Sequence, residues 1–263
     1  MKAIGVFDSG VGGLTIVKEL IRQLPYEDII YFGDTARLPY GTKSKETIIR
    51  FSTEDILFLL KHKVKLICIA CNTASSVALP AIKAHFKVPI VGVITSGARE
   101  AVYATQNKRV GVMGTRSTIK SNAYNSKIRQ LDPKVKVTAI ACPLFVPFVE
   151  EGWLDGKVVL EVARAYLKPL KDSRVDTVIL GCTHYPLLKP VIKKVLGSRV
   201  NLVDSAKQVA IEVKNILTAE GLLNRARRSK NKFYVSDNPE GFRVLAKRFL
   251  GQPVHNVTRV NNV

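Results

Sequence analysis

The chain of 263 residues has few acidic residues, few cysteines and no long hydrophobic run. Its longest uncharged stretch, residues 66–82, is interrupted by asparagine, threonine and serine. It falls short of the roughly 20 apolar residues that span a bilayer. The apolar run at the N-terminus is also too short for a signal peptide before Asp8 appears. We therefore expect a cytoplasmic protein with no membrane partner.

Cysteine is scarce, with four residues in the whole chain. Without a secretory context, this number favours free thiols or metal ligands over a disulfide framework. Low-complexity tracts are absent, and an apolar content of 46% is enough to form a large core. The chain is therefore expected to fold, either as one large domain or as two smaller ones.

The shortage of acidic residues leaves a net charge of +20, from 41 basic and 21 acidic residues. A positive field of this kind raises the local concentration of a small anionic substrate, and it is also typical of nucleic-acid binding. The densest basic cluster, residues 225–232 (RARRSKNK), is interpreted as a solvated loop. No RNA-binding or zinc-finger pattern accompanies it. Nucleic acid is therefore not an expected partner, although the charge leaves that alternative open.

Short β-branched runs alternate with longer amphipathic stretches, a pattern typical of βα units on a mainly parallel sheet. Strands are predicted at residues 3–7, 28–32, 65–70, 89–93, 109–113, 135–139, 175–180, 200–203 and 232–235. Predicted helices include residues 43–61, 118–130, 156–170 and 205–219. This is too many strands for one small sheet, so a second sheet is expected.

A faint internal repeat appears when predicted strand ends are aligned. The separation of Asp8 from Cys71 nearly equals that of Thr115 from Cys182. This pattern predicts an α/β fold of two pseudo-symmetric domains, each a mainly parallel sheet flanked by helices. Ligands of such sheets bind outside the carboxyl ends of the strands, so we expect an active site in the interdomain cleft. The predicted domains are residues 1–97 with 207–263, and residues 98–206.

Two of the cysteines directly follow an apolar strand. Cys71 comes after VKLICIA and before small polar residues that can start a helix, and Cys182 comes after VILG. At a helix N-terminus, free N–H groups and the helix dipole lower a thiol pKa from about 8.5 to roughly 3.5–7.5. His184 stands two residues beyond Cys182 and can assist proton transfer. Either cysteine alone is a weak signal, because free cysteine is commonly a small buried hydrophobe.

The remaining cysteines allow other interpretations. Cys68 lies inside an apolar run, and Cys142 precedes a proline, so both are expected to be structural. Cys68 and Cys71 form a C-x-x-C that can act as a redox pair, and Cys182 with His184 would complete a zinc set. The C-x-x-C lacks the glycine-bearing turn that usually folds two thiolates onto one metal. We therefore disfavour zinc and expect no metal.

Three further segments carry candidate residues. The opening GVFDSGVGG has neither the G-K-[ST] of a P-loop nor G-x-G-x-x-G, which disfavours nucleotide binding. Asp8 ends a predicted strand there and is a candidate for holding an ammonium group or assisting a base. The loop at residues 32–41 is placed for ligand binding, but Asp34 and Arg37 in it can equally pair on the surface. Glu150 and Glu151 are either a helix cap or functional carboxylates.

Together the blocks GVFDSGVGG, YFGDTARLPYG, ACNTAS and LGCTHYPLL resemble the glutamate racemases of the aspartate/glutamate racemase superfamily. RVGVMGT and PLFVPFVEEG lie between these blocks, so the resemblance runs from residue 5 to residue 188. The C-terminal quarter of the chain contributes little to it.

This resemblance implies a racemase that needs neither pyridoxal phosphate nor metal, so no cofactor is expected. Cys71 and Cys182 would act on opposite faces of the substrate, one thiolate taking the α-proton while the other thiol delivers one. Asp8 would lie near Cys71 and His184 near Cys182, with Glu150 or its neighbour on the second side.

The resemblance also implies substrate-binding residues at the strand ends. They are Asp8, Ser9, Pro39, Tyr40, Gly41, Asn72, Thr73, Thr115, Thr183 and His184. The implied substrate is glutamate, the implied role is supply of D-glutamate for peptidoglycan, and the implied assembly is a homodimer. Two alternatives stay open: an aspartate racemase or related superfamily member, and a basic nucleic-acid-binding protein with structural cysteines.

Overall fold

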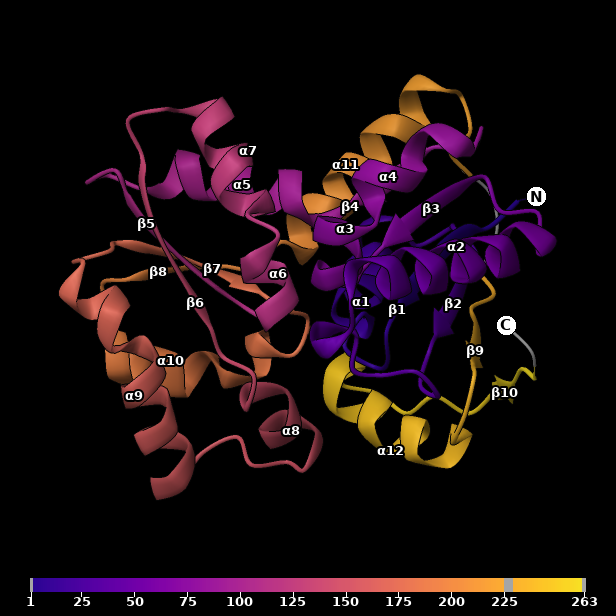
Figure 1. Cartoon of the computed structure of the whole chain (residues 1–263). Helices are drawn as coiled ribbons and strands as arrows, with labels where there is room; N and C mark the ends of the chain where they lie inside the picture. The colour runs from indigo at the N-terminus through magenta and orange to yellow at the C-terminus, as the bar shows by residue number, and fades with distance from the viewer. Residues whose placement is uncertain (1, 225–228, 262–263) are drawn as a thin grey trace. The chain divides into compact units, whose positions relative to one another are not determined.

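The computed structural model describes residues 2–224 and 229–261, and it divides the chain into two compact units (Figure 1). Unit 1 comprises Met1–Val93 and Ala206–Val263, and unit 2 comprises Ile94–Ser205. The domain boundary predicted after residue 97 falls inside helix α5 (Val93–Ala104). Half of the basic cluster at 225–232, residues 225–228, lies outside the described residues. Every helix in the described ranges is too short or too polar to cross a bilayer.

Unit 1 is built on a sheet with the strand order β10-β9-β2-β1-β3-β4. Its strands are β1 (Ile4–Asp8), β2 (Ile29–Gly33), β3 (Leu66–Ile69), β4 (Ile90–Gly92), β9 (Lys232–Val235) and β10 (Val257–Arg259). Neighbouring strands in this sheet pair in parallel. The central strands β1 and β3 are buried along their whole length, as expected for a parallel sheet that is covered on both faces.

Helices from both ends of the chain cover this sheet. They are α1 (Leu14–Gln23), α2 (Lys45–Lys61), α3 (Asn72–Val77), α4 (Leu79–Ile82), α11 (Ala206–Ala219) and α12 (Pro239–Leu250), with 3₁₀ turns η1 (Tyr40–Thr42) and η2 (Lys83–His85). Helix α1 packs against α11 and α12, whereas α2 packs against α3 and α4. The C-terminal segment therefore completes the first unit.

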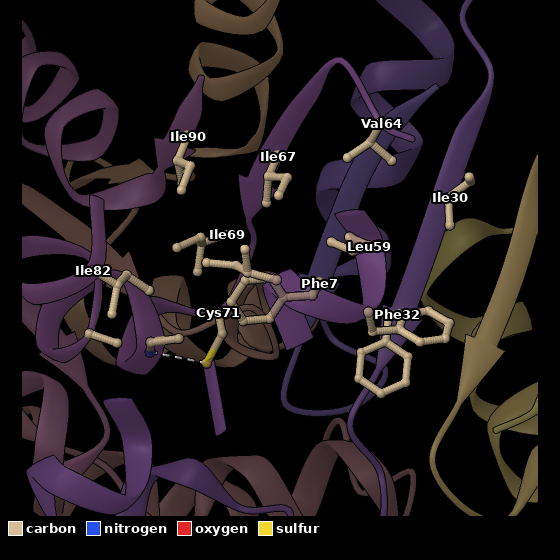
Figure 2. Packing of buried hydrophobic residues seen from close by; sticks show 14 of the residues in the cluster. Phe7, Ile30, Phe32, Leu59, Val64, Ile67, Ile69, Cys71, Ile82 and Ile90 are labelled. Atoms are coloured by element: carbon tan, nitrogen blue, oxygen red, sulfur yellow. Dashed lines mark hydrogen bonds between the residues drawn. The ribbon is translucent and has the colours of Figure 1, made fainter. Parts of the chain in front are cut away.

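The core between the sheet and helices α2 to α4 is apolar and well buried (Figure 2). Phe7 and Ile69 on neighbouring strands meet Leu59 of α2 and Ile82 of α4 in one cluster. Helix α2 begins at a good cap, because the Ser44 side chain accepts a hydrogen bond from the Thr47 N–H. Cys71 belongs to the same cluster, so the site and the core are continuous.

Unit 2 has a smaller parallel sheet with the order β6-β5-β7-β8. Its strands are β5 (Arg109–Gly114), β6 (Lys136–Ala141), β7 (Thr177–Gly181) and β8 (Asn201–Val203). Besides α5, its helices are α6 (Arg116–Lys120), α7 (Ala123–Leu131), α8 (Phe145–Glu150), α9 (Lys157–Asp172) and α10 (Lys189–Leu196), with the 3₁₀ turn η3 (Tyr185–Leu188).

The two sheets share a topology. The order β2-β1-β3-β4 in unit 1 matches β6-β5-β7-β8 in unit 2, strand for strand along the chain. Unit 1 differs by the added strands β9 and β10. The predicted fold class of two similar parallel sheets flanked by helices is therefore confirmed.

One predicted element is wrong in detail, and one strand was missed. The helix expected at residues 118–130 is two helices, α6 and α7, because Asn122 takes a left-handed conformation with φ 59° and interrupts the run. Asparagine tolerates this conformation better than most residues. Strand β10 was not predicted, since its three residues form a partly exposed edge with no strong apolar signal.

Candidate active site

Cys71 stands two residues after the end of β3 and caps α3. Its Sγ accepts a hydrogen bond from the Ala74 N–H at 3.5 Å (Figure 2). The same Sγ lies 3.7 Å from the Ser9 hydroxyl. The residue is only 5% exposed. The sequence prediction of a cysteine at a helix start is correct here, and the position supplies a backbone donor to a thiolate.

Asp8 ends β1, the strand beside β3. Phe7 pairs with Ile69 in the parallel register, so the residues that follow these strands emerge at the same edge of the sheet. Asp8 is buried, and its Oδ2 accepts a hydrogen bond from the Gly10 N–H at 3.0 Å. This edge therefore collects Asp8, Ser9 and Cys71, as well as Asn72 and Thr73 at the buried start of α3.

Tyr31 on β2 lies beneath this edge and was missed in the sequence. Burial, followed by the charges of Asp8 and Cys71, raises its pKa well above the ordinary value. Its hydroxyl donates to the Gly10 carbonyl at 2.7 Å. Tyr31 therefore supports the turn that carries Asp8 and Ser9. No local sequence signal marks it, because it looks like any aromatic residue of a buried strand.

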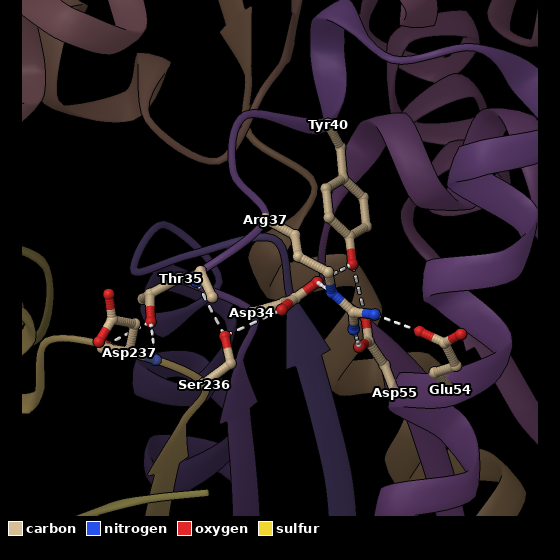
Figure 3. Close-up of polar contacts among 9 residues, drawn as sticks. Asp34, Thr35, Arg37, Tyr40, Glu54, Asp55, Ser236 and Asp237 are labelled. Carbon is tan, nitrogen blue, oxygen red and sulfur yellow. Dashed lines mark hydrogen bonds and ion pairs between the residues drawn. The ribbon is translucent and has the colours of Figure 1, made fainter. Parts of the chain in front are cut away.

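The predicted substrate loop at Pro39, Tyr40 and Gly41 follows β2. The side chain of Tyr40 is buried, and its hydroxyl contacts Asp34 and Asp55 (Figure 3). The Tyr40 hydroxyl is thus turned into the protein and held there. A role of Tyr40 in substrate binding would therefore fall to its backbone.

Asp34 and Arg37 do pair, with Oδ2 and Nε 2.6 Å apart. The interpretation of this pair as a surface feature is wrong, because Asp34 is fully buried. Arg37 also contacts Glu54 and Asp55 of α2. The loop is thus anchored by a buried ionic cluster.

In unit 2, Cys182 follows β7 directly and is 7% exposed. Gly114 pairs with Gly181, so Thr115 and Cys182 emerge side by side at the edge of this sheet. The prediction that Cys182 starts a helix is wrong. A turn and the 3₁₀ turn η3 come first, and α10 begins only at Lys189.

His184 supplies the positive charge near Cys182 that the start of a helix would otherwise have supplied. Its Nδ1 lies 3.9 Å from Cys182 Sγ and 3.3 Å from Thr183 Oγ1, and its Nε2 lies 3.0 Å from Glu150 Oε1. Burial lowers the pKa of His184. The hydrogen bonds to Cys182 and Glu150 and their charges outweigh this and raise the pKa to about 10. We therefore expect His184 to carry a proton at neutral pH, with its positive charge beside the Cys182 sulfur.

The structure also separates the two adjacent glutamates. Glu150, the last residue of α8, contacts His184, whereas Glu151 is exposed. Glu150 is therefore the carboxylate that belongs to this site.

The other two cysteines have a different environment. Burial raises the pKa of Cys68 and of Cys142, with Glu212 adding to the shift at Cys68 and Cys182 at Cys142. All four cysteines are free thiols. Within the described residues, no group of three or more histidine, cysteine or acidic side chains gathers in a metal-binding arrangement.

The registers make the two thiols equivalent. Cys71 follows β3 as Cys182 follows β7, and Ser9 follows β1 as Thr115 follows β5. Two similar parallel α/β units, each with a buried thiol and a hydroxyl at the carboxyl edge, provide the groups expected of an acid–base enzyme.

The comparisons with known proteins specify this class. The Asp/Glu/Hydantoin racemase family model matches residues 4–212, and the chain belongs to this family. It is therefore an isomerase of the racemase type, and the resemblance noted in the sequence is confirmed.

Relatives align over almost the whole chain. The chain is 52% identical to a glutamate racemase of Geobacter metallireducens, covering 99% of this chain and 97% of the relative. Among solved structures, glutamate racemase RacE1 of Bacillus anthracis has a TM-score of 0.95 at 42% identity, covering 99% of this chain and 97% of the other. The Francisella tularensis glutamate racemase, solved in complex with D-glutamate, has a TM-score of 0.93 at 42% identity over the same shares of the two chains.

Proposed function

We propose that the protein is a cofactor-independent glutamate racemase that interconverts L- and D-glutamate by two-cysteine proton transfer at the α-carbon. The observation that carries the proposal is the matched placement of Cys71 and Cys182 at the carboxyl edges of two similar sheets. The names of the relatives support glutamate as the substrate.

In the proposed reaction, the thiolate of one cysteine removes the α-proton of glutamate and becomes a thiol. The other cysteine, present as a thiol, donates its proton to the opposite face of the planar carbanion. Two bases are needed because one base cannot reach both faces of the same carbanion. The proposal therefore requires one substrate molecule within reach of both thiols.

The neighbours of the two thiols suggest which groups assist proton transfer at each cysteine. His184, held by Glu150, keeps a positive charge near Cys182. Asp8 and Ser9 flank Cys71 and are proposed to assist on that side. Each cysteine thus has its own partners, and both can change protonation state during one turnover.

The remaining predicted residues are proposed to hold the substrate carboxylates and stabilise the developing negative charge. Apart from Pro39, which has no N–H and contributes only to the shape of the loop, they provide hydroxyls, amides and backbone N–H groups. This proposed set is Pro39, Gly41, Asn72, Thr73, Thr115 and Thr183, together with the Tyr40 backbone.

The proposed biological role is supply of D-glutamate for peptidoglycan. The proposed assembly is a homodimer, which analytical ultracentrifugation would test.

Aspartate racemisation is the alternative within the family. The two substrates differ by one methylene between the carboxylates, so relative turnover separates them.

The decisive experiment is α-proton exchange. Chelator-treated protein is incubated with L-glutamate in deuterium oxide, and the α-proton NMR signal and optical rotation are followed. We expect loss of both signals. A folded protein that exchanges L-aspartate but not L-glutamate would reassign the substrate, and exchange of neither would refute the proposal.

A further inference from the structure

Asp55 lies within α2, outside the motifs that carry the resemblance, and is fully buried. Its carboxyl group meets two residues from the loop after β2 (Figure 3). Oδ1 accepts a hydrogen bond from Arg37 Nη2 at 2.9 Å, and Oδ2 lies 2.9 Å from the Tyr40 hydroxyl. These contacts connect a core helix to the predicted substrate loop.

The contacts of Tyr40 require an extra proton. Its hydroxyl touches Oδ2 of Asp55 and also Oδ2 of Asp34. A phenol has one proton to donate, so it satisfies only one of these oxygens when both acids are ionised. The second contact becomes a hydrogen bond only when one of the carboxyl groups is protonated.

Asp34 is the less suitable carrier of that proton. Its Oδ2 already accepts from Arg37 Nε at 2.6 Å, and its Oδ1 accepts from the Ser236 hydroxyl at 2.9 Å. Burial and the nearby charge of Asp34 raise the pKa of Asp55 well above its usual value, against the opposing effects of Arg37 and of the Tyr40 hydrogen bond. The proton therefore belongs on Asp55, which donates to Tyr40, while Tyr40 donates to Asp34.

The surrounding charges support a neutral Asp55. Arg37 uses its three guanidinium nitrogens on Asp34, Asp55 and Glu54, so three acids face one cation. The other basic group nearby, Arg50, packs with Arg37 on the ring of Phe51. Across the loop, Asp237 is engaged by Arg259. Loss of the Asp55 proton would add a further buried negative charge with no new cation to balance it.

The cluster is connected to the candidate active site. Tyr40 opens η1, and η1 packs against α3, the helix that Cys71 caps. Tyr40 and Cys71 also share one buried core cluster. A shift of the Tyr40 ring would therefore move both the substrate loop and the support of α3.

We propose that Asp55 is a positioning residue that, as a neutral acid, holds Tyr40 and thereby fixes the backbone of residues 39–41 for substrate binding beside Cys71. Asp55 itself touches no substrate. This inference rests on the proposed function above.

The first test compares two substitutions of this residue by steady-state kinetics with L-glutamate. Asp55→Asn keeps the shape and supplies an N–H donor to Tyr40 in place of the acid proton, so KM should stay within about twofold of wild type. Asp55→Ala removes both contacts, so KM should rise at least about fivefold with a smaller change in kcat. An equal rise in KM in both variants, or no rise in KM in Asp55→Ala, would overturn the proposal.

The second test needs no substrate and applies even when the alanine variant fails to fold. The folded-state pKa of Asp55 is raised above the unfolded value near 3.9, so its contribution to stability is complete below about pH 3.9 and declines as pH rises. The asparagine side chain of Asp55→Asn does not titrate as pH rises. The Tm of Asp55→Asn minus that of wild type should therefore increase from about pH 4 to pH 8.

A flat difference or the opposite slope would overturn the proposal, because an Asp55 that is ionised in both the folded and the unfolded protein has no proton to lose between about pH 4 and pH 8. Wild-type turnover of glutamate, measured in the same series, tests the proposed function separately. Inactive wild type with the expected rise in the Tm difference would refute the function while keeping the protonated cluster. Active wild type with a flat or falling Tm difference would refute only the protonated cluster.

Discussion

Cys71 has a backbone N–H and the Ser9 hydroxyl beside its sulfur, whereas Cys182 has the His184 imidazolium. Thr73 occupies the position in unit 1 that His184 occupies in unit 2, two residues beyond the cysteine. The matched thiols are thus surrounded by different chemistry. A substitution at one side is therefore expected to affect one proton transfer more than the other.

Removal of either thiol should abolish racemisation. We expect Cys71→Ala and Cys182→Ala each to lower kcat by at least about 100-fold, the usual contribution of a general acid or base. Optical rotation of L- and D-glutamate measures this, with far-UV circular dichroism as the folding control. Cys68→Ala is the matched control, since its buried thiol lies in the β3 core. Near-normal turnover in either active-site variant would contradict the two-base assignment.

Glu150→Gln should lower the pKa of His184 from about 10 towards its ordinary value near 6.5. The substitution removes a carboxylate that stabilises the imidazolium at 3.0 Å. The stability and activity that depend on protonated His184 are present at low pH and are lost as pH rises through its folded pKa. The alkaline limb of the activity profile should therefore move to lower pH.

The direct measurement is NMR titration of the ¹³C-labelled histidine rings, with His184→Gln identifying the signal. Glu151→Gln is the matched control, since Glu151 is exposed and should leave the titration unchanged. A His184 pKa that stays near 10 in Glu150→Gln would show that Glu150 does not cause the shift.

Local sequence predicts part of this site well. The small polar residues after Cys71 indicated the start of α3. At Cys182 the same reasoning failed, because Tyr185 and Pro186 form a 3₁₀ turn before the helix. No local sequence pattern indicates the proton that Asp55 donates to Tyr40, since it depends on contacts between separate elements.

At the scale of elements, the start of α1 packs tightly over the ends of two strands. A Cβ on Gly13 would lie 2.7 Å from Asp8 Cβ and 2.9 Å from Ala70 Cβ. Gly13→Ala should therefore displace Asp8 and lower the free energy of unfolding by about 1–3 kcal/mol. Chemical denaturation measures the loss, and turnover should fall with it.

Gly10→Ala is the matched control, because its Cβ would meet only Leu38 Cδ2 at an ordinary 3.6 Å. We expect its unfolding free energy to change by less than about 0.5 kcal/mol. Equal stability losses in the two variants would show that crowding at Asp8 is not the cause.

Sequence periodicity located every strand of the two sheets except β10, because parallel strands buried on two faces are almost continuously apolar. It could not show that the helix at 118–130 breaks at Asn122, since the apolar spacing continues across the break. Strand β10 forms because it pairs with β9, whereas its own composition does not indicate a strand.

At the scale of the whole molecule, unit 1 is formed by two separate segments of the chain, and unit 2 by the segment between them. Residues 94–205 are continuous and hold a complete sheet. Residues 1–93 lack β9, which pairs with β2, and α11, which packs on α1. We expect the isolated fragment 94–205 to unfold cooperatively in denaturant and fragment 1–93 to show no cooperative transition.

Circular dichroism during urea titration measures both fragments, with the full chain as the control. A cooperative transition in fragment 1–93 alone would mean that the C-terminal return is not needed for the first unit to fold. Failure of fragment 94–205 to fold would mean that the second unit depends on the first.

The unlike surroundings of the matched thiols have a thermodynamic consequence. Enantiomers have the same free energy in water, so the equilibrium constant of the proposed reaction is unity and kcat/KM must be equal in both directions. The His184 and Asp8 sides can therefore differ only in how each direction divides that shared value between kcat and KM. Selection on such a duplicated fold can tune which enantiomer saturates the enzyme, but it cannot favour one product at equilibrium.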